Sequence, residues 1–183
     1  MFSGKTDELI ARARARGAVV FKPAVDTRHP RDLVVSHSGA SIEAVSVEDS
    51  AELLAAADDA AAVAIDEIQF FDPGLAEAVE LLRARGSDVV VAGLDLDFRR
   101  EPFPTTRRLA DAAERLERLE ARCTRCGRPA TVTQRLLNGR PAPLDDPVVR
   151  IGDDELYEPR CEECWVAERV EVPSEAGHTL PLP

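Results

Sequence analysis

The stretch Ala62-Ala-Val-Ala-Ile-Asp-Glu-Ile-Gln-Phe-Phe-Asp72 decides the fold of this chain, because it is a short apolar run that ends in two adjacent carboxylates and an aromatic pair. Asp58-Asp59 precedes it and Asp72-Pro-Gly74 follows it, and a bounded apolar run of this length predicts a buried parallel strand. Asp66 and Glu67 would then lie at the carboxyl end of the strand, which is the edge of an open α/β sheet where ligands bind. There one carboxylate can hold a magnesium ion and a second can accept a proton. The alternative is an ordinary acidic turn, and other segments of the chain decide between the two.

The composition indicates a globular protein with one sizeable core. The chain has 183 residues, of which 44% are hydrophobic and 31% charged, enough for one core and a small second module. Its net charge of −11 gives no overall attraction to nucleic acid or to an anionic membrane. No apolar run approaches the roughly 20 residues of a membrane span, and no secretory signal follows Met1. We therefore expect a cytoplasmic protein that binds neither nucleic acid nor membrane.

The N-terminal segment carries the end of a phosphate-binding motif. Met1-Phe-Ser-Gly-Lys-Thr6 runs into the helix-forming segment 7–16, which Gly17 ends. Gly-Lys-Thr at a helix N-terminus offers backbone N–H groups and the helix dipole to phosphate, with Lys5 reaching the β- and γ-phosphates and the Thr6 hydroxyl binding magnesium. So short a motif occurs often by chance. An acid-ended strand about 60 residues later, however, is the magnesium partner that such a loop requires.

Strands and helices alternate in the first part of the chain. Segments 18–21 and 88–93 predict two further strands, and 75–85 predicts a helix whose apolar residues share one face. This alternation is typical of parallel βαβ units, so we expect an α/β fold with a phosphate-loop-type parallel sheet flanked by helices. We also expect a helix over 50–57, capped by the serine at its start, and a charged amphipathic helix over 110–122 that marks the edge of the first domain.

Two loops at the predicted ligand edge carry candidate binding residues. The loop over 94–103 contains Phe98 and Phe103 in a chain with only 4% aromatic residues. Exposed aromatic rings near an acid-ended strand suit a flat, largely apolar ligand such as a base, and packing beneath the loop is the alternative. Arg28 follows the strand over 18–21 and can meet a phosphate, whereas an ordinary surface arginine is the alternative there.

All four cysteines fall in two Cys-x-x-Cys pairs, Cys123 with Cys126 and Cys161 with Cys164. In a reducing compartment such pairs indicate a metal before a disulfide, and four thiolates form a closed tetrahedral site for structural Zn²⁺. Because no coordination position stays open, the metal should fold the segment and take no part in chemistry. The long segment between the pairs contains Gly139-Arg-Pro-Ala-Pro143, so we expect an extended loop that is pinned by the metal and covers the ligand.

These features divide the chain into three parts. We expect a phosphate-loop nucleotide-binding α/β domain over 1–120 and a zinc-ribbon domain with a lasso-like substrate loop over 121–171. The two arms of that loop are predicted over 131–135 and 148–152. The remaining residues, 172–183, show no hydrophobic periodicity and predict a disordered tail.

Taken together, the motifs of this chain resemble those of the zinc-containing, type II thymidine kinases. The resemblance runs from Met1 to about Trp165, and its motifs come in the order found in that family. Agreement at so many positions in the same order is not expected by chance. The motifs are Met-Phe-Ser-Gly-Lys-Thr6, Phe21-Lys-Pro with Asp26-Thr-Arg28, Ser36-His37 with Gly39, Ile65-Asp-Glu-Ile-Gln-Phe-Phe71, Ala92-Gly-Leu-Asp95 with Phe98 and Glu-Pro-Phe103, Cys-x-x-Cys-Gly127, Thr133-Gln-Arg135, and Tyr157 before Arg160-Cys161.

The resemblance implies ATP-dependent phosphorylation of the 5′-hydroxyl of thymidine by a homotetramer, a salvage reaction that supplies DNA synthesis. It implies that Glu67 is the general base on the 5′-hydroxyl and that Asp66 supports Mg²⁺, which agrees with the roles inferred above for the acid pair. The ATP site that it implies consists of Ser3, Gly4, Lys5, Thr6, Asp66 and Gln69. The residues that it places around the nucleoside and the transferred phosphate are Arg28, Phe70, Leu94, Phe98, Phe103, Thr133, Tyr157 and an arm formed by Val148, Val149, Arg150, Ile151 and Gly152.

Two features depart from the family pattern. Family members have a strand and Gly-Pro immediately before Met-Phe-Ser-Gly-Lys-Thr, so the first strand and the first glycine of the phosphate loop are missing from this sequence. Because a truncated loop loses part of its backbone cradle, we expect weak or no activity from this chain and full activity from a version extended upstream. The second departure is Trp165, which follows the last cysteine and leaves the zinc ligands intact.

The alternative function is a non-catalytic binding protein, in which a zinc-ribbon module accompanies a decayed nucleotide-binding domain. The joint presence of Asp66, Glu67, Gln69 and the aromatic loop argues against this alternative, because neutral mutation in a chain that had lost its activity would not be expected to keep all of them. Binding of nucleic acid through the zinc ribbon is disfavoured by the acidic charge balance and the lack of a basic stripe.

Overall fold

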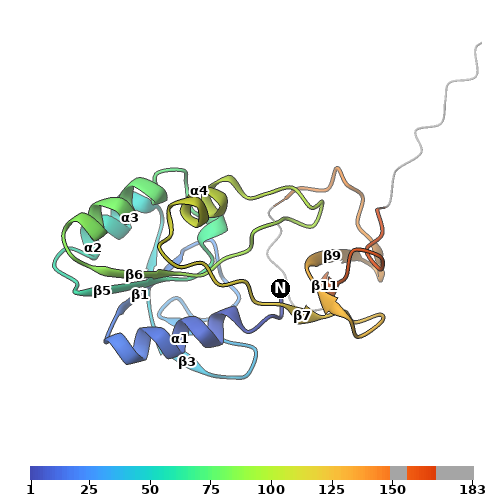
Figure 1. Cartoon of the computed structure of the whole chain (residues 1–183), viewed down its shortest axis with the longest axis horizontal. Coiled ribbons are helices and arrows are strands. Elements are labelled where there is room, and N and C mark those ends of the chain that lie inside the picture. The colour runs from blue at the N-terminus through green and yellow to red at the C-terminus, as the bar shows by residue number, and fades with distance from the viewer. Residues whose placement is uncertain (149–155, 168–183) are drawn as a thin grey trace, which may run out of the picture.

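A computed structural model of the protein describes residues 1–148 and 156–167. Helices alternate with strands up to Ala112, and short strands follow in a second part that lies beside the first along the longest axis (Figure 1). In chain order the elements are α1 (Lys5–Arg16), β1 (Val19–Pro23), β2 (Leu33–Val35), β3 (Ser41–Glu43), β4 (Val45–Val47), α2 (Ser50–Ala56), β5 (Ala62–Ile65), the 3₁₀ turn η1 (Ile68–Phe70), α3 (Leu75–Ala84), β6 (Asp88–Val91), α4 (Pro104–Ala112), β7 (Ala121–Arg122), β8 (Pro129–Ala130), β9 (Val132–Leu137), β10 (Arg140–Pro141) and β11 (Tyr157–Arg160).

A four-stranded parallel sheet with the order β4-β1-β5-β6 forms the centre of the larger part. β5 lies inside it and pairs in parallel with β1 on one side and with β6 on the other. All residues of β5 are buried, because helices cover both faces of the sheet. Burial on both faces explains why its sequence is a continuous apolar run without polar alternation. The predicted α/β fold with a parallel sheet flanked by helices is confirmed.

The helices build one hydrophobic cluster on each face of the sheet. α1 lies on one face, where Leu9 and Ile10 pack in a cluster with Ala64 of β5. α2, α3 and α4 lie on the opposite face, whose cluster contains Val63 and Ile65 (Figure 1). β5 contributes to both clusters because successive side chains of a strand point to opposite faces. Among the described residues, no helix has both the length and the apolar character that a membrane span requires.

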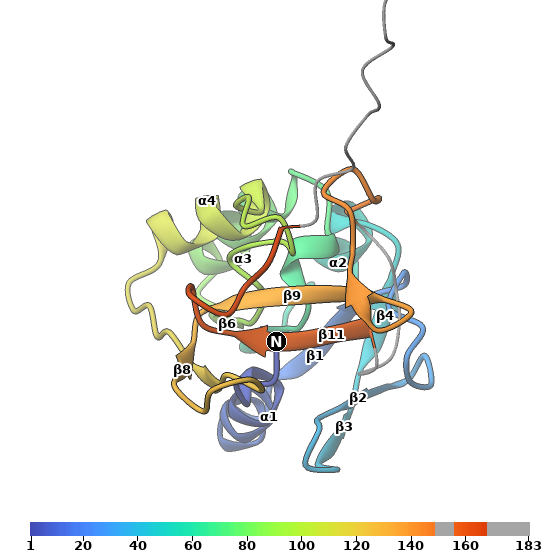
Figure 2. The same ribbon diagram turned by 90° about the vertical axis from the view of Figure 1, so that its right-hand side faces the viewer.

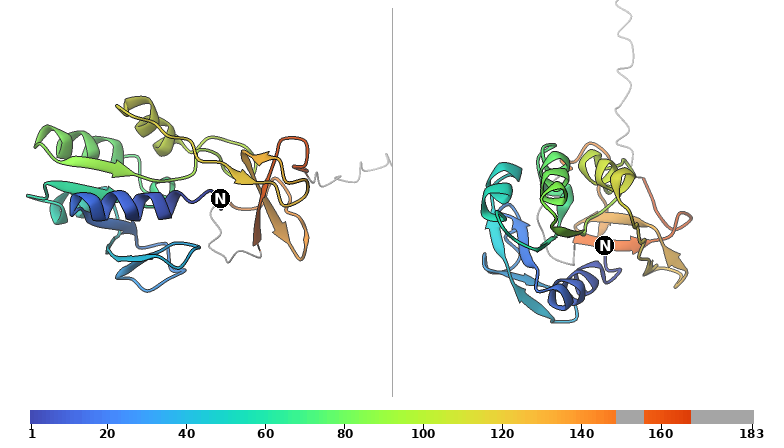
Figure 3. Two further views of the ribbon diagram at one scale, coloured as in Figure 1. Left: turned by 60° about the horizontal axis from the view of Figure 1, so that its bottom comes forward. Right: turned by 60° about the vertical axis from the view of Figure 1, so that its left-hand side comes forward.

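Residues 121–148 and 156–167 form a smaller part built from strands, which we call the cysteine module. β9 is its central strand and pairs antiparallel with β10 and with β11. Figure 2 shows β9 and β11 side by side, and Figure 3 shows the module at one end of the molecule, close to the N-terminus. The arm expected over 131–135 corresponds to β9. The arm expected over 148–152 lies outside the described residues except for Val148, and so does the predicted tail.

The cap predicted for α2 is wrong by one residue. Asp49 is the N-cap, since its carboxylate accepts a hydrogen bond of 2.8 Å from the backbone N–H of Glu52. Ser50 lies inside the first turn, and its hydroxyl instead donates to Asp72 at 2.8 Å. Aspartate and serine cap helices about equally well, so the sequence does not distinguish Asp49 from Ser50 as the N-cap. The tertiary hydrogen bond of Ser50 to Asp72 leaves Asp49 as the cap.

The helix expected over 110–122 is also wrong, because the structure places α4 at Pro104–Ala112. Proline fits the first turn of a helix, where its missing N–H is not needed, and Leu109 anchors the helix in the core. Residues 113–120 are exposed and form no helix, because the packing that would stabilise their charged sequence as a helix is missing.

Candidate functional site

The two acids after β5 lie at the ligand edge of the sheet, and the backbone turns sharply between them. Glu67 has a left-handed conformation with φ 52°, which is uncommon for a residue with a side chain. The Asp66 carboxylate accepts a hydrogen bond from the backbone N–H of Glu67 at 2.9 Å and thereby supports the turn. The chain then enters η1. This turn aims the Glu67 side chain back over the end of the sheet, where it is buried.

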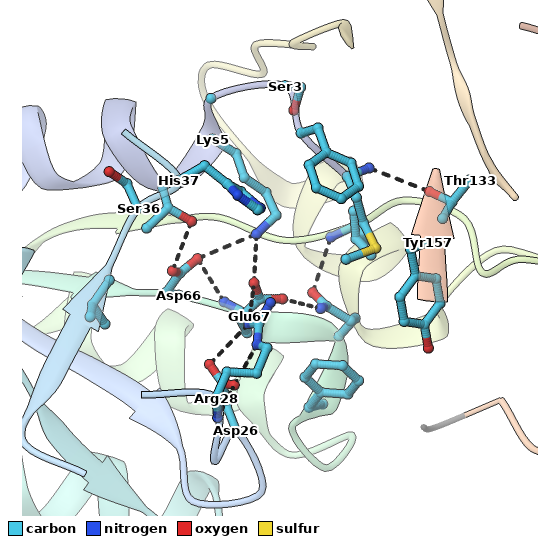
Figure 4. Close-up of a pocket in the computed structure, with 18 of the residues that line it drawn as sticks. Ser3, Lys5, Asp26, Arg28, Ser36, His37, Asp66, Glu67, Thr133 and Tyr157 are labelled. Atoms are coloured by element: carbon cyan, nitrogen blue, oxygen red, sulfur yellow. Dashed lines mark hydrogen bonds and ion pairs between the residues drawn. The ribbon is translucent and has the colours of Figure 1, made fainter. Parts of the chain in front are cut away.

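Two cations converge on the Glu67 carboxylate from opposite sides (Figure 4). Lys5, at the start of α1, places its Nζ 2.8 Å from Glu67 Oε1. Arg28, in the loop after β1, places its Nη2 2.8 Å from the same oxygen. Asp26 orients Arg28 through two hydrogen bonds, of 2.7 Å to Nε and 3.0 Å to Nη2. Segments distant in the sequence thus meet at one carboxylate oxygen.

Burial and the neighbouring charges together shift the pKa values of the two acids in opposite directions. Burial acts to raise the pKa of Glu67, but the charges of Lys5 and Arg28 outweigh burial and hold it well below its ordinary value of 4.5. Burial raises the pKa of Asp66, and the attraction of Lys5 only partly offsets this effect. Glu67 is therefore ionised at neutral pH and engaged in ion pairs. It can accept a proton only once another anion attracts Lys5 and Arg28 away.

The Gln69 carboxamide fixes the far side of the Glu67 carboxylate. Its Nε2 donates to Glu67 Oε2, and its Oε1 accepts from the backbone N–H of Leu94 at 3.0 Å. Gly93 leaves the space for this side chain, because a Cβ at that position would lie 2.8 Å from Gln69 Oε1 and 2.4 Å from Ile68 Cγ1. The glycine after β6 thus allows η1 to pack directly against the backbone of the neighbouring strand end.

The segment Ser3–Thr6 faces the acids from the start of α1. Gly4 has φ 79°, a left-handed conformation at the N-cap of α1, and the first backbone N–H groups of a helix have no partner within the helix. The Thr6 hydroxyl donates to Asp66 Oδ2 at 3.2 Å, and Lys5 Nζ lies 3.7 Å from Asp66 Oδ1. A hydroxyl and a carboxylate at this separation are the oxygen donors that Mg²⁺ prefers, so these residues fit the ion.

The opposite wall of the same cavity is aromatic and belongs largely to the loop after β6 and to the cysteine module. The cavity has a volume of about 910 Å³, and its lining includes Phe98, Phe103 and Tyr157. Arg135 of β9 connects two of these residues. Its guanidinium lies 4.0 Å from the centre of the Phe98 ring and donates to the Tyr157 hydroxyl at 2.8 Å. One end of the cavity thus carries the acids and their cations, and the other is largely aromatic, with the Arg135 guanidinium packed against Phe98.

Every described residue that the sequence assigned to the ATP and nucleoside sites lines this one cavity. Their individual roles remain predictions. The assigned residues Val149, Arg150, Ile151 and Gly152 lie outside the described part of the chain. The lining residues among those assigned are Ser3, Gly4, Lys5, Thr6, Arg28, Asp66, Glu67, Gln69, Phe70, Leu94, Phe98, Phe103, Thr133, Val148 and Tyr157.

Sequence reasoning missed two residues that organise the cavity. Asp26 precedes Arg28 by two residues, and its place in the Asp26-Thr-Arg28 motif was the available signal. Arg135 is almost fully buried, with a side chain that is 1% exposed and pairs with Asp146 at 2.7 Å. A buried arginine is rare, and although Arg135 ends the Thr133-Gln-Arg135 motif, no hydrophobic or charge periodicity marks it as buried.

The four cysteines come together in the cysteine module as expected. Their sulfur atoms all lie within 4.8 Å of one another, and the Sγ atoms of Cys126 and Cys161 are 3.6 Å apart. A tetrahedral site with Zn–S bonds of about 2.3 Å separates its sulfur atoms by about 3.8 Å, so the cluster fits zinc. Burial opposes ionisation of Cys123, but backbone N–H groups outweigh it and lower its pKa to about 6, which favours a thiolate ligand.

The fold and the site define an α/β protein of the phosphate-loop type, in which an acid-ended central strand faces a lysine and a threonine at a helix N-terminus and a four-cysteine module closes the ligand cavity. Comparison with protein families identifies the group within this class. The family model described as thymidine kinase matches residues 1–165. The chain therefore belongs to the thymidine kinase family, and its cysteine cluster fits the zinc-containing, type II members. The family resemblance inferred from the sequence is confirmed.

Proposed function

We propose that this chain is an ATP-dependent thymidine kinase that transfers the γ-phosphate of ATP to the 5′-hydroxyl of thymidine. The observation that carries the proposal is the convergence of Lys5 and Arg28 on Glu67 in a cavity whose other end is aromatic. Phosphoryl transfer requires cations on the transferred group and a base beside the attacking hydroxyl, held in one place. Membership of the thymidine kinase family supports the choice of donor and acceptor.

The ion pairs of Glu67 give the site an order of events. The phosphates of ATP carry more negative charge than one carboxylate and attract Lys5 and Arg28. Glu67 then loses the two charges that depress its pKa, so that burial is no longer outweighed and the pKa of Glu67 rises. The 5′-hydroxyl proton passes to Glu67 as the bond from the 5′-oxygen to the γ-phosphorus forms and the bond from that phosphorus to ADP breaks. Proton removal can be late and modest, because positioning and charge neutralisation dominate this reaction.

Thr6 and Asp66 are the residues that would hold Mg²⁺, as their paired oxygen atoms suggest. When bound, the ion neutralises charge on the phosphates. Lys5 lies beside both acids, with its Nζ 3.7 Å from Asp66 Oδ1 and 2.8 Å from Glu67 Oε1, so in the proposal it needs only a small movement to contact the phosphates.

The aromatic end of the cavity suits a nucleobase. In the proposal, Phe98, Phe103 and Tyr157 contact the flat faces and edges of thymine, and the Thr133 hydroxyl offers a polar contact beside them. Leu94 and Phe70 contribute apolar surface to the same wall. The resemblance to the type II thymidine kinases is the support for assigning backbone groups of the arm over 148–152 to the base, and only Val148 of this arm lies within the described residues. We also propose a homotetramer in the cytoplasm, and light scattering on the purified chain tests the assembly.

The test is the transfer of labelled γ-phosphate from ATP·Mg²⁺ to thymidine by this chain and by a version extended through the upstream reading frame. Glu67→Gln should lower the rate by about 10²–10⁴-fold, because it removes the general base. Glu77→Gln is the matched control, since Glu77 is exposed and pairs with Arg108 on the far face. If neither version transfers phosphate while both fold and hold zinc, the non-catalytic binding protein replaces the kinase.

A further inference from the structure

Trp165 links the cysteine module to the loop that carries the aromatic wall. Its indole Nε1–H donates to the backbone carbonyl of Phe98 at 3.2 Å. The guanidinium of Arg100 lies 5.3 Å from the centre of the indole ring and also forms an ion pair with Glu162. Because Glu162 and Trp165 lie within and directly after the second cysteine pair, two residues of the loop are held by this pair.

The residue that follows Trp165 attaches the same segment to β9. The backbone N–H of Val166 donates to Gln134 Oε1 at 2.8 Å, and Gln134 Nε2 donates to the backbone carbonyl of Val166 at 3.1 Å. Gln134 is buried, and its neighbours Thr133 and Arg135 line the cavity. Trp165 and Val166, which we call the strap, therefore connect both walls of the aromatic end of the cavity.

The loop over 94–103, which contacts the strap, is rigid around Phe98. The carboxylate of Asp97 is buried and accepts hydrogen bonds from the backbone N–H groups of Arg99 and Glu101 at 2.8 and 2.9 Å, which fixes the turn around Phe98. The Phe98 ring is buried against the Arg135 guanidinium. A displacement of the Phe98 carbonyl must therefore also move its ring within the cavity.

We propose that Trp165 is a positioning residue for the nucleoside pocket, through which the four-cysteine site sets the place of Phe98. This inference rests on the proposed function only where it names a nucleoside as the ligand. Cys164 directly precedes Trp165, so a metal that holds the Cys164 side chain in place also restrains the backbone of Trp165. Trp165 touches no reacting atom in this account and acts through the loop alone.

Hydrogen exchange without any nucleoside tests the strap itself. In the zinc-loaded full chain, Trp165→Phe removes the N–H donor but keeps a ring beneath Arg100. The amides of Asp97, Arg100 and Phe103, which donate to carbonyls inside the loop, should then exchange about three- to tenfold faster, the effect of one lost hydrogen bond. Val166→Ala is the matched control, because the Val166 side chain is exposed and its contacts use the backbone. Zinc content should be unchanged in both variants.

Thymidine affinity tests the consequence for the pocket. Calorimetric titration should show Kd for thymidine about three- to tenfold higher in Trp165→Phe than in the unchanged chain, with Kd for ATP unaltered. Unchanged loop exchange, or faster exchange with an unchanged thymidine Kd, would overturn the inference. If the unchanged chain binds no thymidine, the proposed function fails while the exchange measurement still decides whether Trp165 positions the loop.

Discussion

Gly93→Ala probes the packing that holds the general base. Gly93 follows β6, and a Cβ there would lie 2.4 Å from Ile68 Cγ1 and 2.8 Å from Gln69 Oε1. Non-bonded carbon atoms normally approach only to about 3.5–4.0 Å, so η1 must move by about 1 Å to accept one methyl group. Ile68 is buried and cannot rotate into solvent. The displacement therefore passes to Gln69 and, through its hydrogen bond, to the Glu67 carboxylate.

The expected cost has a stability part and a catalytic part. Overpacking of this kind destabilises a protein by about 1–3 kcal/mol. A misplacement of about 1 Å at a reacting group can lower the rate about 10²-fold. Gly74→Ala separates the two parts, because a Cβ at Gly74 would also clash, at 2.6 Å from Ser50 Oγ and 2.7 Å from Asp72 Oδ1, but away from the Glu67 carboxylate.

The assay compares the denaturation midpoint and kcat/KM for thymidine phosphorylation in both glycine variants. Both should lose stability, and only Gly93→Ala should lose kcat/KM by about 10²-fold at a temperature where all proteins are folded. A folded Gly93→Ala variant with unchanged kcat/KM would show that the Gln69 contact does not position Glu67, and the reasoning would be wrong.

Three further predictions concern the metal, a buried arginine and pH. Chelation of zinc should unfold the cysteine module, because a closed four-thiolate site contributes folding free energy. Hydrogen exchange of the β9 amides should then become faster, while that of the β5 amides stays slow. Slow exchange in both strands after chelation would contradict a structural metal. Arg135→Met should lower the free energy of unfolding by about 3–5 kcal/mol and raise KM for thymidine, since it breaks a buried pair with Asp146; an unchanged denaturant midpoint would count against this. The pKa of Glu67 is lower in the folded protein than its ordinary value of 4.5, so the ionised carboxylate stabilises the fold. This contribution to the free energy of unfolding is complete above about pH 4.5 and is lost as the pH falls below that value. The difference in unfolding free energy between the unchanged chain and Glu67→Gln should therefore shrink below about pH 4.5, and a constant difference down to about pH 3 would refute the assignment.

Much of the larger part of the fold follows from local sequence patterns. The apolar run before Asp66 predicts β5, and the helical periodicity over 75–85 predicts α3. Both predictions are correct because most of the apolar residues in these patterns are buried in the core of the folded chain. The helix expected over 110–122 was wrong because its charged residues satisfy the helical pattern without a surface to pack on. Strands such as β4, of three residues, are too short to give a signal of their own.

The site is less visible in the sequence than the fold. The pattern of residues indicates that Lys5 and Glu67 belong to one site, but the ion pairs of Glu67 with Lys5 and Arg28 require the start of α1, the loop after β1 and the turn after β5 to meet at one sheet edge. Arg135 shows the limit most clearly, since its burial against Phe98 is a tertiary property of β9 and the loop after β6. Such contacts leave no periodic trace along the chain.

Identification of the phosphorylated product shows whether the chain is a thymidine kinase. The chain and its upstream-extended version are incubated with ATP·Mg²⁺ and thymidine, and phosphorus NMR follows the fate of the γ-phosphate. We predict a new phosphomonoester whose resonance couples to the two 5′ protons of thymidine, formed by at least one version and lost with Glu67→Gln. Release of inorganic phosphate alone, or a phosphomonoester that forms at the same rate in Glu67→Gln, would contradict it.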